Sequence, residues 1–285
     1  MPNDRMGFIG GSDIASVMGL SRWKTPLQLW AEKTGQVEPD DLSNNEAVEM
    51  GNELEDTVAR LFTKRTGMAV RRSPWRYYHP NYDQFQCQVD RLVTKTDELL
   101  ECKTCSFRKE KEWAGEEIPV EYILQVQWQL LITGRKVGWI AVLIGGQKFL
   151  YKKIEADGEL QQKMLESAVA FWDMIEKKIP PVVEGDDNAF MVKLHPKASE
   201  EIREASEDFN ASIALLQQTK AQIIDLEATK NELEAKIKSA IGDLKGIKTK
   251  EYTAKWVNIK GSTFTVTKPD GRQLRISKNE GEENE

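Results

Sequence analysis

The sequence is poor in the two residue types that build most disulfide and zinc sites. Its 285 residues include three cysteines, Cys87, Cys102 and Cys105, and two histidines, His79 and His195. Three cysteines cannot form a disulfide framework, and so small a set of ligands makes a poor four-ligand zinc site. The "CKTC" pair has the spacing of a zinc or redox motif, but on a strand its two thiols would point to opposite faces. The sequence therefore argues against a structural zinc site.

Long apolar runs and an excess of positive charge are also missing. No stretch approaches the roughly 20 apolar residues that span a bilayer, and the first residues, "MPNDRMGFIGGSD", lack the regions of a signal peptide. We therefore expect a protein without membrane segments in the cytosol. The net charge of −6 excludes a global basic field, but a local basic groove with a bound cation stays compatible with a nucleic-acid enzyme.

Helix and strand signals alternate over the first 185 residues. Ser12 is predicted to cap a short helix, Thr25 a second one, and a longer helix is predicted over residues 46–66, with Glu55 on its inward stripe. Alternation of period two predicts five strands, over residues 68–79, 83–93, 98–105, 136–146 and 148–154. Two further helices are predicted over residues 119–134 and 157–178. This pattern predicts an α/β class, a small mixed β-sheet flanked by helices, in a core domain of residues 1–185.

The sequence after this core predicts a C-terminal extension. Residues 186–245 read as a linker and a long coiled-coil-like helix that begins near residue 198, with apolar residues every seven positions at Ile202, Phe209, Leu216 and Ile223. Residues 246–285 predict a small β extension with a turn at Pro269-Asp270-Gly271, followed by an acidic, disordered tail. The long helix could pack against itself, another subunit or the core, and the pattern does not choose among them.

The stretch "QVDRLVTKTDELLECKTC", residues 88–105, places two acids and a lysine in two predicted strands. If the strands form an antiparallel hairpin, Asp90 lies opposite Lys103 and Leu92 lies opposite Glu101. Cross-strand partners share a face, and so do alternate residues of one strand. Asp90, Glu101 and Lys103 are therefore predicted to project to the same side.

Two carboxylates that converge in this way repel each other unless they are protonated, paired or bound to a cation. Oxygen ligands favour hard ions, which predicts Mg²⁺, with Mn²⁺ as the alternative, and Glu55 is a candidate third carboxylate. A metal with a neighbouring lysine can activate water and neutralise charge on a phosphate, which is the chemistry of phosphodiester hydrolysis. The structural alternative is a salt bridge from Asp90 to Lys103, with Glu101 in solvent.

The segment "VDRLVTKTDELLECK" resembles the Asp, then Glu-x-Lys, core of the PD-(D/E)xK nuclease superfamily. Its surroundings resemble the phage lambda exonuclease group, the YqaJ-like viral recombinases, over roughly residues 5–155. "RMGFIGGSDIASVMG" is similar to the family's opening motif, "EMGNELEDTVARLF" to its glutamate-bearing helix, and "YILQVQWQLLITG" to its Gln-x-Gln helix. Val89 departs from the proline in the superfamily's name, which leaves the neighbouring carboxylate intact. The resemblance implies a restriction-endonuclease-like core.

The resemblance also implies roles for residues at the matching positions. A pair of metal ions would be bound by Asp90, Glu101, Glu55 and the carbonyl oxygen of Cys102. The attacking water would be contacted by Lys103 and Gln125. The alternative for Gln125 is a place in the polar seam of a buried helix.

The same resemblance implies that Arg5 and Ser12 hold the 5′-terminal phosphate of DNA. A helix that begins at Ser12 would offer free N–H groups to an anion, and Arg5 could add a charge-assisted contact. Alternatively, Ser12 only caps a helix and Arg5 is a surface charge. Further cations that could line a DNA groove are Arg71, Arg72, Lys148, Lys152 and Lys153.

The resulting hypothesis is a Mg²⁺-dependent deoxyribonuclease of the alkaline exonuclease type. By resemblance, it degrades one strand of double-stranded DNA from the 5′ end and leaves single strands for phage-type recombination. Its implied partners are duplex DNA ends, further copies in a ring-type trimer and a single-strand annealing protein. The alternatives are a structure-specific or internal-cutting endonuclease of the same superfamily, and a non-catalytic DNA or protein interaction module that works through the C-terminal extension.

Overall fold

The chain forms two compact units, which are described separately. The computed structural model describes residues 4–263, 265 and 271–276. The first unit comprises Met1–His195 and the second Pro196–Glu285. All site residues predicted from the sequence fall within the first unit.

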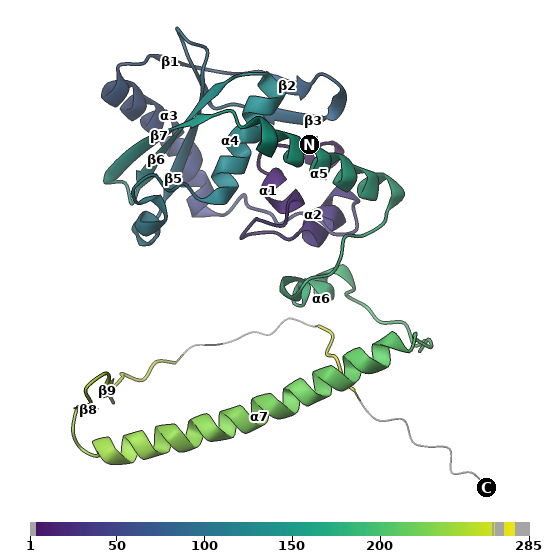
Figure 1. Ribbon diagram of the computed structural model, residues 1–285, viewed down its shortest axis with the longest axis vertical. Coiled ribbons are helices and arrows are strands. Elements are labelled where there is room, and N and C mark those ends of the chain that lie inside the picture. Colours follow the sequence, from purple (N-terminus) through teal and green to yellow (C-terminus); the bar gives the residue numbers. More distant parts are fainter. Residues whose placement is uncertain (1–3, 264, 266–270, 277–285) are drawn as a thin grey trace. The chain divides into compact units, whose positions relative to one another are not determined.

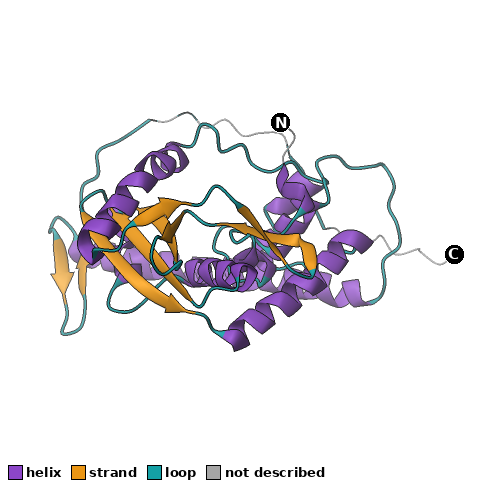
Figure 2. Cartoon of the chain, turned by 90° about the horizontal axis from the view of Figure 1, so that it is seen from above, coloured by secondary structure: helices purple, strands orange, loops and turns teal. Residues whose placement is uncertain are grey.

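A five-stranded mixed sheet forms the centre of the first unit. Its strand order is β1-β4-β5-β6-β7, with β5 and β6 parallel and the other neighbours antiparallel. The strands are β1 Val70–Arg72, β4 Arg91–Val93, β5 Leu99–Cys105, β6 Val137–Ile144 and β7 Lys148–Glu155. They lie side by side, drawn in orange in Figure 2. A separate antiparallel pair consists of β2 Arg76–His79 and β3 Tyr82–Gln88. The predicted α/β class with a small mixed sheet is confirmed.

The first two predicted strands each break in two, which the alternation pattern did not show. Residues 73–75 separate β1 from β2, and Pro74 at this break has no N–H to donate to a sheet. Val89 and Asp90 separate β3 from β4, where Asp90 lies in a bend. The two halves of each predicted strand therefore join different sheets.

The longer helices of the first unit lie close to their predicted positions. They are α2 Pro26–Lys33, α3 Glu46–Thr66, α4 Val120–Thr133 and α5 Gly158–Lys177. Thr25 caps α2 in a capping box with Gln28, and Gly67 and Gly134 end α3 and α4 with φ of 73° and 68°. Left-handed backbone at these two positions favours glycine, so local sequence sets both helix ends.

The prediction that Ser12 caps the first helix is wrong. Helix α1, Ile14–Val17, has only four residues, its N-cap position is Asp13, and no side-chain cap bond is made there. Ser12 lies in the preceding turn, after the short helix η1, Asp4–Gly7. The Asp13 carboxylate instead accepts a hydrogen bond from the Gly10 N–H and pairs with Lys33. So short a helix offers no extended N-terminal anion site.

Two apolar clusters cover the two faces of the main sheet. The larger cluster includes Leu99 of β5 together with residues of α1, α2, α4 and α5. The smaller cluster joins Leu100 of β5 to Val58 and Phe62 of α3. Figure 1 shows α3 and α4 on either side of this sheet. Since alternate residues of a strand share a face, Leu99, Glu101 and Lys103 face α4.

Close packing between α4 and the sheet gives a stability prediction at Gly138 of β6. A Cβ atom there would lie 2.7 Å from Val126 Cγ1 and 2.8 Å from Leu99 Cδ1. We expect Gly138→Ala to lower the free energy of unfolding by about 1–3 kcal/mol, because the core must shift to admit the methyl group. Urea unfolding of the full chain, followed by tryptophan fluorescence, measures this loss. Gly158→Ala is the control, since a Cβ at Gly158 has no neighbour within 4 Å; equal effects of both substitutions would contradict the packing argument.

The compact unit continues beyond residue 185, where the linker was predicted to begin. It includes the short helices η3 Gly185–Asp187 and α6 Phe190–Leu194. Asp187 is fully buried and accepts hydrogen bonds from the Thr25 hydroxyl and from the Glu184 N–H. These contacts tie the segment to the start of α2, which its polar composition did not reveal.

The second unit contains a long helix and a small hairpin. Helix α7, Asp208–Ile241, begins later than predicted, and Ile202 lies before it. Strands β8 Gly246–Lys248 and β9 Thr253–Lys255 pair antiparallel. No strand occurs at residues 272–276, and the predicted turn at Pro269-Asp270-Gly271 and the acidic tail lie largely outside the described residues. Within the described part of the chain, no helix combines the length and apolar character needed to cross a bilayer.

Candidate active site

The hairpin of β4 and β5 has a different register from the predicted one. Leu92 pairs with Leu99 and Arg91 with Leu100, so the register is shifted by two residues. The cause is the loop of residues 94–97. The Val93 N–H donates a hydrogen bond to the Glu98 carbonyl across this loop, and Asp97 has left-handed backbone with φ of 59°. A shift of two residues preserves the face of every side chain. The predicted common side for the three charged residues therefore does not depend on the predicted register.

Glu101 is the centre of a polar network between β5 and α4. Its side chain is almost fully buried. Oε1 lies 2.6 Å from the Lys103 ammonium and accepts from Gln125 Nε2 at 2.5 Å, while Oε2 accepts from Gln129 Nε2 at 2.7 Å. Lys103 also donates to Gln125 Oε1 at 3.0 Å. A buried carboxylate requires such partners, which fix its position.

Asp90 completes the group from the bend between β3 and β4. Its Oδ2 atom accepts a hydrogen bond of 2.8 Å from the Cys102 N–H. Burial, and next the negative charge of Glu101, raise the pKa of Asp90 to about 8, against the effects of Lys103 and the Cys102 N–H. The two acids therefore share one site in which a second negative charge is unfavourable.

Lys103 is held as a cation by these carboxylates. Burial lowers the pKa of Lys103, but the charges of Glu101 and Asp90 outweigh this effect and leave the pKa above its ordinary value. The ammonium group also lies 5.2 Å from the centre of the Tyr122 ring. Without a bound cation, Lys103 is thus a proton donor rather than a base.

Glu55 and Cys102 take up positions beside this group. The Glu55 carboxylate pairs with Arg91 Nη1 at 2.5 Å, and the same Arg91 nitrogen donates to the Asp90 carbonyl at 2.6 Å. Arg91 also pairs with Asp56 at 2.5 Å. Glu55 therefore supports the Asp90 backbone through Arg91. The Cys102 side chain packs on the α3 face of the sheet and Cys105 on the α4 face, so the two thiols diverge as predicted.

A cavity of about 260 Å³ opens in front of these side chains. Among the residues that line it are Ser12, Arg76, Gln86, Asp90, Glu101, Gln125 and Gln129. The side chain of Arg5 lies outside what the structure describes. Gln86 is buried, and its Oε1 atom has no hydrogen-bond partner within the described residues. The structure thus places Ser12 at the same cavity as the acids, although the two segments are far apart in the sequence.

Several of these residues were not singled out by the sequence. Gln129 lies one helical turn after Gln125, which was the only signal that both amides could contact Glu101. Arg91 follows Asp90 directly, and its pairing with Glu55 and Asp56 had no signal in the sequence. Arg76 and Gln86 come from β2 and β3, whose separate pairing was not predicted, so nothing in the sequence brought them to the site.

The cations predicted to line a DNA groove make local contacts instead. Arg71 pairs with Asp97 at 3.3 Å and Arg72 with Asp56 at 2.5 Å. Lys148 pairs with Glu110 at 2.6 Å and Lys153 with Glu155 at 2.7 Å, and Lys152 donates to the Trp113 carbonyl at 3.0 Å. None of the five lines the cavity in front of the acids.

Comparison with known proteins places the chain in a family. A family model described as "YqaJ-like viral recombinase domain" matches residues 2–136. The chain is 39% identical over 259 residues to the uncharacterized protein YqaJ of Bacillus subtilis (strain 168), covering 89% of this chain and 81% of that protein. The chain belongs to the YqaJ-like viral recombinase family. The resemblance inferred from the motifs is confirmed.

Solved structures similar to this YqaJ-like chain include an alkaline exonuclease, LHK-Exo, from Laribacter hongkongensis. The match has a TM-score of 0.52 and 25% identity, and covers 61% of this chain and 91% of that chain. A structure of LHK-Exo in complex with dAMP matches with a TM-score of 0.51, at the same identity and coverage. The fold of the first unit is therefore similar to that of an alkaline exonuclease.

The residues at the cavity fit a hard divalent cation of the kind the family resemblance implies. Asp90 and Glu101 offer carboxylate oxygens, which Mg²⁺ and Mn²⁺ prefer. Burial, and next the charge of Glu101, raise the pKa of Asp90, and a bound cation would favour the ionised form of this carboxyl. Within the described residues, no three acidic, histidine or cysteine side chains are already arranged as a metal site. The fit therefore rests on two carboxylates, since Glu55 is paired with Arg91.

Proposed function

We propose that this YqaJ-like protein is a Mg²⁺-dependent deoxyribonuclease that degrades double-stranded DNA from the 5′ end. The main supporting observation is that Asp90, Glu101 and Gln125 line one cavity, while Lys103 contacts both Glu101 and Gln125. Its similarity to an alkaline exonuclease supports the reaction class. Mg²⁺, or Mn²⁺ in its place, is the proposed cofactor, and a pair of ions is the predicted number.

Each residue of the network has a defined task in this proposal. Asp90 and Glu101 would hold the metal, which when bound lowers the pKa of a water molecule and neutralises charge on the phosphate. Gln125 fixes the ammonium of Lys103 and the carboxylate of Glu101 relative to each other. Lys103 then orients the attacking water and donates a hydrogen bond to the charged phosphate oxygens. Gln129 holds the second oxygen of Glu101 and restricts its rotation.

The terminal nucleotide would occupy the cavity in front of these residues. The similar exonuclease LHK-Exo has been crystallised with dAMP, and the cavity of about 260 Å³ opens directly in front of the acids. Ser12 lines the cavity, and Arg5 lies in η1 only a few residues earlier in the chain. We keep the assignment of Ser12 and Arg5 to the 5′ phosphate as a prediction.

Linear duplex DNA with a 5′ phosphate or a 5′ hydroxyl tests both activity and end recognition. The wild type is expected to release nucleotides in Mg²⁺ and to prefer the phosphorylated end. Arg5→Ala and Ser12→Ala are expected to lower that preference by on the order of tenfold or more, since a lost charge-assisted contact costs about 1.5–3 kcal/mol. Arg65→Ala, at the exposed last turn of α3, is the control. No release from either substrate would refute the nuclease, and an unchanged preference in both variants would refute the end-binding assignment.

The other predicted functions give different results in the same assay. An internal-cutting endonuclease would cleave closed circular DNA and would not need a 5′ phosphate. A non-catalytic interaction module would keep its function in Asp90→Ala. The ring-type trimer and the annealing-protein partner remain predictions from the family resemblance.

A further inference from the structure

An exposed tryptophan lies near the proposed active site and has no role in the mechanism above. The Trp23 side chain is 57% exposed. Two cations lie over its ring, Arg22 at 5.7 Å and Lys109 at 5.8 Å from the centroid. Phe107, in the same short helix η2 (Phe107–Trp113) as Lys109, is 64% exposed. Exposed aromatic rings interleaved with cations are typical of surfaces that bind single-stranded nucleic acid.

A chain of aromatic rings connects Trp23 to the proposed active site. The ring centroids of Trp23 and Tyr122 are 6.0 Å apart, and the Tyr122 ring lies 5.2 Å from the Lys103 ammonium. Tyr122 is also stacked on the buried Trp113, with centroids 5.5 Å apart and planes at 23°. Trp23 is therefore held one aromatic ring away from Lys103, on a rigid support.

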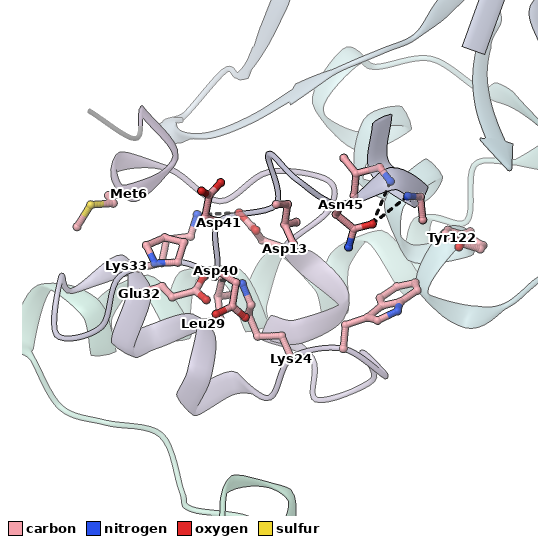
Figure 3. A pocket seen from close by; sticks show the side chains of 15 residues that line it. Met6, Asp13, Lys24, Leu29, Glu32, Lys33, Asp40, Asp41, Asn45 and Tyr122 are labelled. Carbon is pink, nitrogen blue, oxygen red and sulfur yellow. Dashed lines mark hydrogen bonds and ion pairs between the residues drawn. The ribbon is translucent and has the colours of Figure 1, made fainter. Parts of the chain in front are cut away.

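Trp23 and Tyr122 also line a large cavity of the first unit (Figure 3). This cavity has a volume of about 940 Å³ and is a neighbour of the proposed catalytic cavity, because Asp13 lines both. Its apolar lining includes Met6, Leu29 and Leu42. The cavity is therefore large enough to hold a nucleobase.

The charges around this cavity favour a base over a phosphate group. Its two lysines are already paired, Lys24 with Glu32 at 2.5 Å and Lys33 with Asp13 at 2.8 Å. Two further acids also line the cavity, Asp40, which pairs with Lys193 at 2.7 Å, and Asp41, which has no basic partner among the lining residues. A phosphate would meet excess negative charge here, whereas an uncharged aromatic base would meet apolar surface and two rings.

We propose that Trp23 stacks on an unpaired base of the DNA strand that is being cut, next to the scissile phosphate. This inference rests on the proposed nuclease function and adds a base-binding site to it. Stacking on Trp23 holds the strand apart from its complement while the phosphate lies at Asp90 and Glu101. Such a contact is independent of sequence, since every base has an aromatic face.

The test pairs Trp23 variants with DNA that lacks single bases. Single-stranded, 5′-phosphorylated 12-mers carry one abasic site at each of the first four positions in turn. Their affinity for the full-length protein is measured by fluorescence anisotropy. Measurements in EDTA use proteins with Lys103, and measurements in Mg²⁺ use proteins that also carry Lys103→Ala, so that the DNA is not cut. We expect one abasic position to weaken wild-type binding by about 5- to 150-fold. Trp23→Ala should weaken binding of the intact 12-mer by a similar factor and abolish the effect of that abasic position, and Trp23→Phe should restore part of the affinity.

Trp75→Ala is the matched control, because Trp75 is 66% exposed and lines neither cavity. The base-stacking site is overturned if Trp23→Ala binds the intact 12-mer as tightly as wild type, if abasic sites have no effect, or if Trp75→Ala gives the same loss. If the wild type cuts DNA but one of these results is found, the stacking site is overturned and the proposed nuclease function is not. A protein that neither binds nor cuts DNA overturns the proposed function as well.

Discussion

Lys103→Ala is expected to lower the rate of DNA hydrolysis by on the order of 10²–10³-fold, the usual loss when one positioned donor to the developing charge is removed. The ammonium group is held by Glu101 and Gln125, so it has one defined position beside these two residues. Alanine removes both the cation and this orientation. Release of acid-soluble nucleotides from linear duplex DNA in Mg²⁺ measures the loss, with DNA affinity measured separately.

Two further substitutions separate catalysis from folding. Removing a cation from beside the buried Glu101 also destabilises the protein, so each variant's melting temperature is compared with wild type. Lys103→Gln keeps a hydrogen-bond donor near Glu101 without the charge, and should be folded but nearly inactive. Lys95→Ala, in the exposed loop between β4 and β5, should be fully active. A Lys103→Gln variant with wild-type activity would exclude Lys103 from the reaction.

Asp90→Asn is expected to stabilise the metal-free protein while it removes the response to Mg²⁺. In wild type, burial and the charge of Glu101 raise the pKa of Asp90 from 3.8 to about 8. The folded state therefore holds a proton that the unfolded chain releases, and wild type in EDTA loses stability as the pH rises from about 4 to about 8. Asparagine has no such charge and can keep the bond to the Cys102 N–H. At pH 8 we expect a gain on the order of 2 kcal/mol, or about 4–8 °C.

Thermal melts in EDTA and in Mg²⁺, at pH 6 and pH 8, measure both effects. Wild type should gain stability from Mg²⁺, and more at pH 8 than at pH 6, since a proton competes with the cation for Asp90. Asp90→Asn should show little gain at either pH. Asp83→Asn, a change of the same chemistry on β3 outside both cavities, is the control. An equal Mg²⁺ response in wild type and Asp90→Asn would refute the assignment of Asp90 as a metal ligand.

The helices of the first unit were predictable because their end signals are local. Asn45 and Asp157 accept hydrogen bonds from the first N–H groups of α3 and α5, and Gly67 and Gly134 supply left-handed backbone at two ends. The same reasoning gave the wrong cap at Ser12, where the polar side chain belongs to a turn and Asp13 occupies the cap position. A serine followed by apolar residues fits both structures, and only the contact of Asp13 with Lys33 distinguishes them.

The hairpin shows which parts of the site could be predicted and which could not. Placement of Glu101 and Lys103 on one face follows from their spacing of two residues on a strand, and this holds for any register. The register itself depends on the length of the loop at residues 94–97 and on the left-handed conformation of Asp97. Most residue types avoid that conformation, so a shorter turn was the natural prediction.

The sequence by itself determined the family, the ends of the longer helices of the first unit, and the two acids, the lysine and Gln125 of the site, because motifs, caps and strand periodicity act over a few neighbouring residues. Tertiary structure decided which groups meet. Gln125 and Gln129 reach Glu101 because α4 packs on the face of β5 that carries it. Glu55 forms an ion pair with Arg91, and the Tyr122 ring contacts both Trp23 and the Lys103 ammonium. Contacts between distant segments depend on strand order and helix packing, which no local pattern encodes.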